Sequence, residues 1–321
     1  ETSSLDAHQA DLVGISMCYK TGSSGYIPLA HKTGKNLDTQ KVLNILKPYL
    51  EDKSIKKIGQ NIKFDYIIFY KRGIKINSIE DTMLMSYVLD AGKNRHNLDM
   101  LAEIHLKHKN ISFKELVGTG KKQLNFSEVD ISQAKDYAAE DADITLRLYK
   151  IFRENLKLEK LTQIYENFEK PMVEILAQME IHGVKIDNTF LAKLSEKFGK
   201  KINILEKDIF KITNTKFNIG STKQLGEILY NQLKIASLKK TKKGSYATSA
   251  SVLEDLAFKG HKLPKLILDW RQLSKLKNTY SDSLQEHLNP KTKRVHTSFL
   301  LAATSTGRLA SSDPNLQNIP I

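Results

Sequence analysis

The acidic residues of the first half are the side chains best suited to chemistry. Glu1 precedes a predicted strand in the segment ETSSLD, and Asp65 lies where GQNIKFDYIIF passes from strand to helix. Asp141 and Asp143 lie in KDYAAEDADITL, with Tyr137 one helical turn before Asp141. Carboxylates that converge from different elements suit hard divalent cations, with water and substrate phosphate completing the ligand shell. Two such ions about 4 Å apart can activate a water for phosphodiester cleavage, and a neighbouring Tyr can orient that water.

Each of these residues also has a structural interpretation. Tyr137 and Asp141 fit an ordinary pair on a helix surface, and Asp65 fits a helix cap. Asp81 is predicted to be the N-cap of a helix that begins at Thr82. Asp143 is two residues from Asp141, so we expect it on another face of the helix and in solvent. Spacing alone leaves the metal site and these alternatives open.

The chain is basic, and the excess of positive charge lies mostly in its second half. Its 321 residues carry a formal net charge of +14. Residues 1–160 contain 25 Lys and Arg against 21 Asp and Glu, a net of +4, whereas residues 161–321 contain 25 against 15, a net of +10. Such an excess favours a polyanionic partner, most simply nucleic acid. The alternative is a Lys-rich composition that has no bearing on binding.

Composition and cysteine content narrow the class of protein. A hydrophobic content of 40% and a charged content of 27% are typical of a globular chain, and the length allows two domains. No run of about 18 apolar residues predicts a membrane span. The single cysteine, Cys18, excludes an internal disulfide and suits a reducing cytoplasm. Because the chain begins at Glu1 rather than Met, we expect it to be a piece of a longer protein.

The elements that would position these side chains change in kind near residue 160. Leu12–Tyr19 and Gly25–Ala30 are predicted to form a strand hairpin, while Leu37–Leu50 and Ile62–Tyr70 have helical spacing around the short strand Lys56–Gly59. This alternation predicts an α/β fold with a mixed sheet flanked by helices. After the predicted boundary at residues 155–165 the chain is helical until a strand at 294–300. Helices are expected at 161–181, 188–213, 222–233, 250–259 and 263–288.

Two polar segments of the second half have the composition of contact surfaces. Residues 235–249, IASLKKTKKGSYATS, form a basic loop between predicted helices; such a loop can grip phosphates or simply be solvated. Residues 305–321, STGRLASSDPNLQNIPI, show no helical periodicity and no strand alternation, but many hydroxyl and amide groups. Such a segment is built to contact a polar partner. The alternative is a mobile tail.

Several of these motifs resemble the bacterial DNA polymerase I family, the family A DNA polymerases. GQNIKFD, DTML and YAAEDAD are similar to its proofreading 3′–5′ exonuclease, and LKKTKKG, FNIGSTKQLGEILY, PKLILDWRQLSKLKNTYSDSL and TSTGRLASSDPNLQNIP to its polymerase part. The resemblance covers essentially the whole chain. It implies a ribonuclease H-like domain at 1–158 and the start of the polymerase domain at 159–321. The latter would comprise a mainly α-helical thumb at about 165–290 and the first strand of the palm at about 291–321.

For the first domain the resemblance implies an exonuclease site of the DEDD type with two Mg²⁺ or Mn²⁺ ions. It makes Glu1, Asp65 and Asp141 the metal ligands and Tyr137 the residue that orients the water. Leu5, Asn61 and Phe113 match positions that hold a frayed primer end; such apolar and aromatic side chains contact bases without reading sequence. The family's first motif is Asp-x-Glu, and its Asp would fall two residues before Glu1. A second ion is therefore expected to be poorly held by this chain.

For the second domain the resemblance implies contacts with a primer–template duplex. Lys239, Lys240, Thr241 and Lys242 would grip the duplex backbone, and such contacts set position rather than sequence preference. Arg271 and Lys275 match positions near the template and primer backbones. The residues expected against base edges and sugars of the minor groove, where donors sense pairing geometry, are Arg308, Asn315 and Gln317.

The implied parent is a monomeric DNA polymerase of replication and repair in the bacterial cytoplasm, at the nucleoid. The palm aspartates and fingers helix are not in this sequence, so the chain itself is not expected to add nucleotides. Two alternatives belong to other classes. One is a non-catalytic DNA-binding module or inactive exonuclease-like domain; the other is a stand-alone nuclease of the ribonuclease D type, which would not be expected to carry LKKTKKG.

Overall fold

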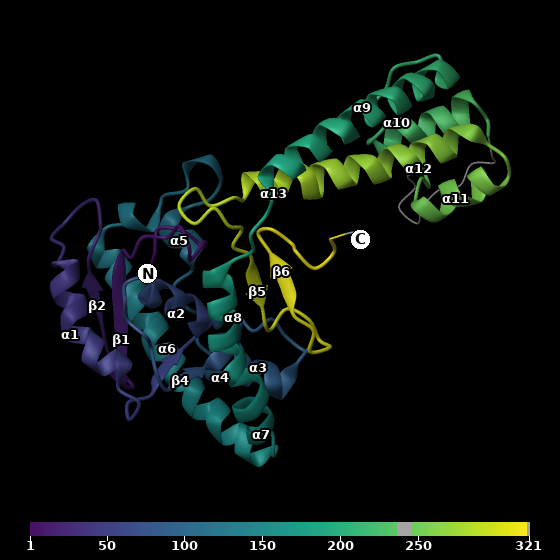
Figure 1. The fold of residues 1–321 in the computed structure, drawn as a ribbon. Coiled ribbons are helices and arrows are strands. Elements are labelled where there is room, and N and C mark those ends of the chain that lie inside the picture. The colour runs from purple at the N-terminus through teal and green to yellow at the C-terminus, as the bar shows by residue number, and fades with distance from the viewer. Residues whose placement is uncertain (236–245, 320–321) are drawn as a thin grey trace. The chain divides into compact units, whose positions relative to one another are not determined.

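The computed structural model describes residues 1–235 and 246–319, and it divides into two compact units (Figure 1). The N-terminal unit comprises Glu1–Gly183 together with His296–Asn315. The helical unit comprises Val184–Val295 and the residues from Leu316 onward. These units are defined by packing, and the division into domains at residue 158 stays a prediction.

The strands of the N-terminal unit form two-stranded sheets. β1 (Gly14–Lys20) and β2 (Ser23–Pro28) make an antiparallel hairpin, with Met17 opposite Gly25. β3 (Lys57–Gly59) pairs in parallel with β4 (Ile79–Asp81). The mixture of strand directions and helices confirms the α/β class. Among the described residues, however, these strands do not join into the single mixed sheet that the sequence predicted.

One long helix packs against several other elements of the N-terminal unit. α6 (Ile131–Leu158) begins at its N-cap Asp130 and packs against both strands of the hairpin and against α3 and α4. Its apolar face, including Leu148 and Phe152, is fully buried. The other helices of this unit are α1 (Thr39–Glu51), α2 (Ile62–Tyr70), α3 (Thr82–Asp90), α4 (Leu98–Leu106), α5 (Phe113–Val117), η1 (Gly120–Lys122), η2 (Phe126–Glu128), α7 (Thr162–Ile164), the π-helical η3 (Tyr165–Glu169) and α8 (Lys170–His182).

The C-terminal part of the N-terminal unit corrects one sequence expectation. β5 (Ser298–Leu300) pairs antiparallel with β6 (Ala310–Ser312), so the segment after residue 304 contains a strand. The sequence around β6 shows no alternation of apolar residues that would predict a strand. The strand forms because β5 supplies its hydrogen-bond partners, and the buried Thr297 and Ser311 hydroxyls join the two segments at 2.7 Å.

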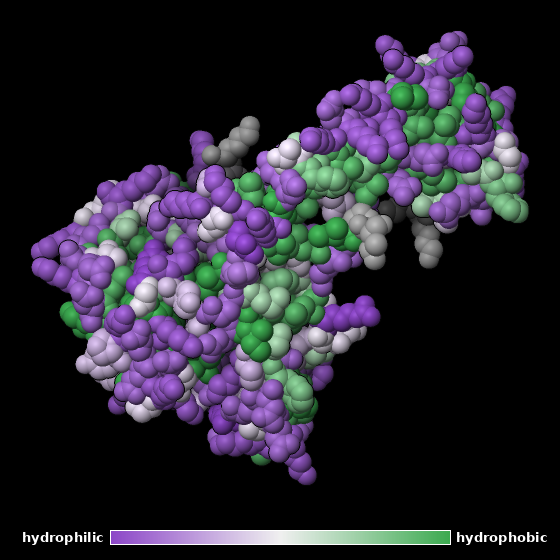
Figure 2. Space-filling model, viewed as in Figure 1, coloured by the Kyte–Doolittle hydropathy of each residue, from purple (hydrophilic) through white to green (hydrophobic). Residues whose placement is uncertain are grey.

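The helical unit confirms the prediction that the second half is mostly α-helical. Its long helix α9 (Asn188–Thr213) has the predicted bounds and packs along α12 (Lys262–Lys275). Ile209 and Ile267 are fully buried in its core. On the face shown in Figure 2, both hydrophilic and hydrophobic side chains lie at its surface. Its other helices are α10 (Thr222–Gly226), the π-helical η4 (Glu227–Gln232), α11 (Ala250–Phe258), the π-helical η5 (Leu276–Asp282) and α13 (Ser283–Glu286).

None of the helices built from the described residues is both long and apolar enough to cross a bilayer.

Candidate functional site

A cleft of about 1040 Å³ lies in the N-terminal unit, and three of the predicted site residues line it. Its walls come from the β1–β2 hairpin, β3 and the helices α1, α2 and α6. Glu1, Asp65 and Asp141 all border this space. The structure thus brings together three carboxylates from three separate parts of the chain.

Asp65 is placed by the start of helix α2. Asn61 precedes the helix in a left-handed conformation, with φ of 57°. The carboxylate of Asp81 accepts the backbone N–H groups of Asn61 and Ile62 at 3.1 and 2.9 Å. The same carboxylate accepts the N–H of Met83 at 2.9 Å and so caps α3, as the sequence predicted. One buried side chain therefore fixes the starts of two helices, one of which carries Asp65 in its first turn.

Glu1 is held beside the start of β1 by backbone hydrogen bonds. Its amino group donates to the carbonyl of Gly14 at 2.8 Å, and its carbonyl accepts the N–H of Val13 at 2.9 Å. Thr2 continues the pairing with an antiparallel bridge to Leu12. This short ladder positions the first residue at the edge of the cleft.

Tyr137 and Asp141 lie one turn apart on α6, and their side chains are hydrogen-bonded. Both are half-buried. The ring of Tyr137 lies 6.0 Å from that of Phe113 and 6.1 Å from that of Phe126, centroid to centroid. The hydroxyl is therefore held in an aromatic setting with Asp141 as its acceptor.

The electrostatics of the cleft favour a cation. Burial raises the pKa of Asp65 to about 6, opposed by the amino group of residue 1 and assisted by the negative charges of Glu1 and Asp81. Burial, followed by the charge of Glu1, raises the pKa of Asp141 to about 8. Burial and the charge of Asp141 also raise the pKa of Tyr137. Glu1 thus repels both carboxylates, and a bound cation would relieve that repulsion.

The donor set fits a hard divalent ion in its chemistry. Carboxylate oxygens are the ligands that Mg²⁺ and Mn²⁺ prefer, and Mg²⁺ keeps several waters and takes substrate phosphate as well. Across the part of the chain that the structure describes, no group of three or more His, Cys, Asp or Glu side chains is arranged as a ligand shell that could hold a metal ion. The three carboxylates share one cleft without forming such a shell.

Asp143 corrects a sequence expectation, because it is not in solvent. Its side chain is buried, with only 8% of the residue exposed. The carboxylate accepts the N–H of Gly22 at 2.6 Å and forms an ion pair with Arg147 at 2.6 Å. Asp143 therefore anchors the turn of the β1–β2 hairpin to α6. Its acceptor role depends on a residue 121 positions away, which the helical spacing does not reveal.

The residues expected to hold a primer end lie in different settings. Leu5 is 95% exposed in the loop after Glu1. Phe113 is 39% exposed and stacks over Phe126, with 6.4 Å between ring centroids. The side chain of Asn125, next to Phe126, donates to the carbonyl of Ser3 at 2.7 Å and ties the loop of Leu5 to this aromatic cluster. Asn61 is exposed at the start of α2.

The residues expected to contact duplex DNA are spread over both units. Arg271 is half-buried, and its guanidinium donates to the carbonyl of Thr248 at 2.6 Å, whereas Lys275 is exposed on the same helix, α12. Arg308 and Asn315 are exposed in the N-terminal unit, and Gln317 is exposed in the helical unit. The remaining expected contacts lie outside the described residues: Lys239, Lys240, Thr241 and Lys242.

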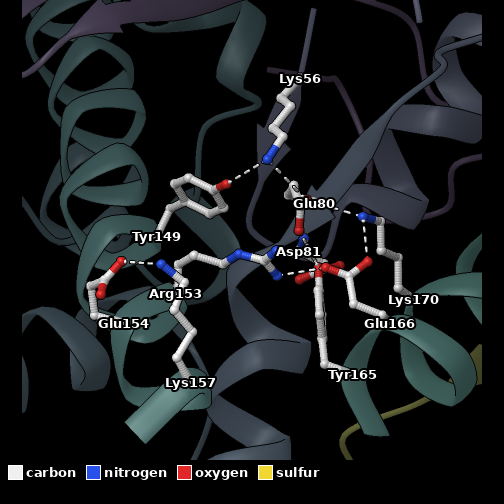
Figure 3. Close-up of polar contacts among 10 residues, drawn as sticks. All are labelled: Lys56, Glu80, Asp81, Tyr149, Arg153, Glu154, Lys157, Tyr165, Glu166 and Lys170. Carbon is white, nitrogen blue, oxygen red and sulfur yellow. Dashed lines mark hydrogen bonds and ion pairs between the residues drawn. The ribbon is translucent and has the colours of Figure 1, made fainter. Parts of the chain in front are cut away.

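Sequence reasoning missed a buried ionic network beside Asp81 (Figure 3). Glu80 is 2% exposed, and its carboxylate lies 3.0 Å from the ammonium of Lys170 and 3.0 Å from the hydroxyl of Tyr165. Tyr165 also accepts the N–H of Asp81 at 2.9 Å. Lys170 and Arg153 both contact the carboxylate of Glu166. The one available sequence signal was an acidic residue next to the predicted N-cap.

Comparisons with known proteins assign the two parts of the chain separately. Residues 1–157 match the family described as 3′–5′ exonuclease, and residues 188–321 match DNA polymerase family A. The whole chain is 46% identical to part of DNA polymerase I from Rhizobium leguminosarum and 44% identical to part of that from Pseudomonas aeruginosa. It spans about a third of each, 34% and 36% of their lengths.

A solved structure resembles nearly all of the fold. It is the POL domain of Pol1 from M. smegmatis in complex with DNA primer-template and dNTP. The TM-score is 0.80 at 27% sequence identity, and the match covers 97% of this chain and 50% of that one.

Proposed function

This chain belongs to the bacterial DNA polymerase I family, with 3′–5′ exonuclease sequence at residues 1–157 and family A polymerase sequence at 188–321, and we propose that its cleft performs metal-dependent 3′–5′ exonucleolysis. One observation carries the proposal. Glu1, Asp65 and Asp141 border a single cleft, and Tyr137 is hydrogen-bonded to Asp141. The fold proposed for this segment is ribonuclease H-like.

In the proposed mechanism Glu1, Asp65 and Asp141 would hold divalent metal for cleavage of the last phosphodiester of a DNA strand. When bound, Mg²⁺ or Mn²⁺, as two ions in the intact parent, would activate the attacking water and neutralise charge on the phosphate. The Tyr137 hydroxyl orients that water from its aromatic setting. Leu5, Asn61 and Phe113 contact the unpaired bases, which needs no sequence preference because every base offers a stacking face.

The second part of the proposal concerns duplex DNA. The helical second half carries most of the net positive charge, which supports phosphate binding. We propose that Lys239, Lys240, Thr241 and Lys242 grip the backbone, with Arg271 and Lys275 nearby. In the same proposal the minor groove is contacted by Arg308, Asn315 and Gln317. The whole protein would be a monomeric DNA polymerase of replication and repair in the bacterial cytoplasm, at the nucleoid.

The test uses single-stranded oligonucleotides labelled at the 3′ or the 5′ end, with Mg²⁺, with Mn²⁺ or with chelator. We expect metal-dependent shortening from the 3′ end. Asp65→Asn and Asp141→Asn should abolish it, because each removes a charge that holds the metal. Asp136→Asn, an exposed position on the same helix as Asp141, serves as the matched control and should cleave normally.

A second candidate function is supported by the lack of a closed shell of three ligands in the described part of the chain. In that case the chain binds DNA without cutting it. No cleavage in either metal, together with salt-sensitive binding of a primer–template duplex, would contradict the nuclease proposal and support this one.

A further inference from the structure

The loop between β5 and β6 lies against the C-terminal part of α3, within the N-terminal unit (Figure 1). The hydroxyl of Tyr87 donates to the carbonyl of Thr304 at 2.7 Å and accepts the N–H of Gly307 at 3.1 Å. This hydroxyl therefore uses both its donor and its acceptor capacity on one loop. Tyr87 belongs to the segment that matches the exonuclease family, and its two partners belong to the segment that matches the polymerase family.

The residue that these contacts restrain most directly is Arg308. Gly307 precedes it and is bound to Tyr87. The hydroxyl of Thr304 donates to the carbonyl of Arg308 at 2.8 Å, and Thr304 is itself bound to Tyr87. The backbone of Arg308 is therefore restrained through two contacts that both lead to Tyr87, whereas its side chain is exposed.

A glycine sets how closely the loop approaches α3. Gly92 lies just after the helix with φ of 80°, a conformation that favours glycine. A Cβ atom at this position would lie 2.7 Å from the Cβ of Ser305, which is closer than real Cβ contacts. A side chain at position 92 would therefore displace the loop. Tyr87 and Gly92 thus hold the same loop at two neighbouring points.

The side chain of Tyr87 is itself held in place. Tyr87 is 5% exposed, and its ring meets that of His96 edge-on, with 5.5 Å between centroids. The Nδ1 atom of His96 lies 2.9 Å from the hydroxyl of the buried Ser86. The side chain of Gln60 donates to the carbonyl of His96 at 2.7 Å. A side chain that is fixed by packing and by its neighbours' hydrogen bonds can position another residue accurately.

We propose that Tyr87 is a positioning residue for duplex binding, because it holds residues 304–308 so that the side chain of Arg308 meets the minor groove. This inference rests on the proposed contact between Arg308 and duplex DNA. A loop that is held before binding loses less conformational freedom on binding than a mobile loop does. If only a fraction of the molecules held the loop in place, the apparent affinity for the duplex would fall by that fraction. Duplex affinity then depends on a side chain of the exonuclease-family segment.

The test measures binding of the full chain to a fluorescent primer–template duplex by anisotropy, with chelator present to prevent cleavage. We expect Arg308→Ala to weaken binding about tenfold. Tyr87→Phe keeps the ring and removes the hydroxyl, and should weaken binding about fivefold. In the Arg308→Ala background, Tyr87→Phe should change binding by less than about twofold, because its effect passes through Arg308. Tyr70→Phe, at a 39% exposed position on α2, is the matched control and should bind normally.

A rescue experiment separates positioning from a general loss of stability. Gly92→Ala should weaken duplex binding, because its methyl group would displace Ser305. Ser305→Gly removes the Cβ atom that the methyl group meets, so the double variant should recover most of the affinity. The backbone strain of an alanine at position 92 remains in the double variant, so relief of that strain cannot explain a recovery. Urea unfolding of each variant measures the change in stability separately.

The outcomes distinguish this inference from the proposed function on which it rests. If Arg308→Ala weakened binding and Tyr87→Phe did not, the positioning role would be wrong and the duplex contact of Arg308 would stand. If Arg308→Ala bound the duplex normally, the proposed contact would be wrong, and the positioning role with it. An equal effect of Tyr87→Phe with and without Arg308 would overturn the inference by showing that Tyr87 acts only through stability.

Discussion

At the scale of single residues, the two aspartates near the middle of α6 have opposite electrostatic settings. Although burial opposes it, the N–H of Gly22 and the guanidinium of Arg147 hold the pKa of Asp143 below its usual range. Burial and the charge of Glu1 raise the pKa of Asp141 to about 8. Asp143 is thus a satisfied structural anion, whereas Asp141 forms no ion pair with a Lys or Arg among the described residues. Only the second is suited to gain from a bound metal ion.

His8 provides a prediction about acid stability. Its ring stacks on that of His296 with 4.5 Å between centroids, and its Nε2 atom is buried without a hydrogen-bond partner. Burial, then the charge of His296, lowers the pKa of His8 to about 4; Lys71 and Lys63 also lower it, and Asp6 opposes them. The unfolded state then binds more protons than the folded state between pH 6.5 and 4. The contribution of His8 to the free energy of unfolding is therefore fully present above pH 6.5 and is lost as the pH falls toward 4.

We expect His8→Phe, which keeps the stacking and cannot be protonated, to lose less stability on acidification. After allowance for solvent screening at this partly exposed site, the difference should be about 1–2 kcal/mol between pH 7 and pH 4. Urea unfolding of the N-terminal unit, followed by hydrogen exchange, measures it. His287→Phe, at an exposed position of the helical unit, should leave the acid sensitivity unchanged. If the stability of His8→Phe fell with pH as much as that of the parent chain, the lowered pKa of His8 would be contradicted.

Local and distant interactions explain which residues the sequence could predict. Asp81 was predicted to be an N-cap because the backbone N–H groups that its side chain accepts, those of Met83 and Leu84, lie within three residues of it. Asp143 is held by Gly22, and the pKa of His8 is lowered first by burial and then by the charge of His296; both partners are more than a hundred positions away. Such partners are brought close by the fold, so no local sequence pattern could predict them.

At the scale of elements, the network around Glu80 joins β4 to α6, η3 and α8 (Figure 3). Tyr165 donates to Glu80 and accepts the N–H of Asp81, whose carboxylate in turn caps α2 and α3. The start of α8 is thereby linked to the start of the helix that carries Asp65. A buried carboxylate in such a place is stable only while its cations remain.

We therefore expect Lys170→Met to destabilise the N-terminal unit by about 3 kcal/mol. The substitution removes the cation at 3.0 Å from Glu80 and leaves Lys56, at 4.0 Å, as its remaining ion-pair partner among the described residues. Lys157→Met breaks only the exposed pair with Glu154 and should cost less than about 1 kcal/mol. Urea unfolding measures both. Adding Glu80→Gln to Lys170→Met should restore part of the loss. If the two lysine substitutions lowered stability equally, Lys56 alone would be sufficient to stabilise the buried carboxylate of Glu80.

Helices and strands differed in how well their sequences predicted them. α2 and α9 have the predicted bounds because their periodicity and caps are local. β6 was missed because its three residues form a strand only by pairing with β5. The bounds of a helix can thus be predicted from its own residues, whereas the formation of a short strand depends on the strand that it pairs with.

At the scale of the whole molecule, a segment remote in sequence completes the N-terminal unit. Leu301 is 5% exposed in the core cluster that contains Phe152 and Leu176. The N–H of Phe299 donates to the buried carboxylate of Glu180 at 2.6 Å, and the hydroxyl of Tyr87 donates to the carbonyl of Thr304 at 2.7 Å. No domain boundary drawn along the sequence could include these contacts, because residues 184–295 intervene in another unit.

Truncation after Val295 should therefore destabilise the unit at the opposite end of the sequence. Loss of the buried Leu301 costs about 2–5 kcal/mol, and loss of the Phe299 hydrogen bond to a buried carboxylate adds about 1.5–3 kcal/mol. We expect hydrogen exchange to accelerate in α3 and α8 while the core of α9 and α12 stays protected. Truncation after Asn315, which removes only residues 316–321, is the matched control and should leave α3 and α8 unchanged. If both truncations left the N-terminal unit equally stable, residues 296–315 would not contribute to its stability.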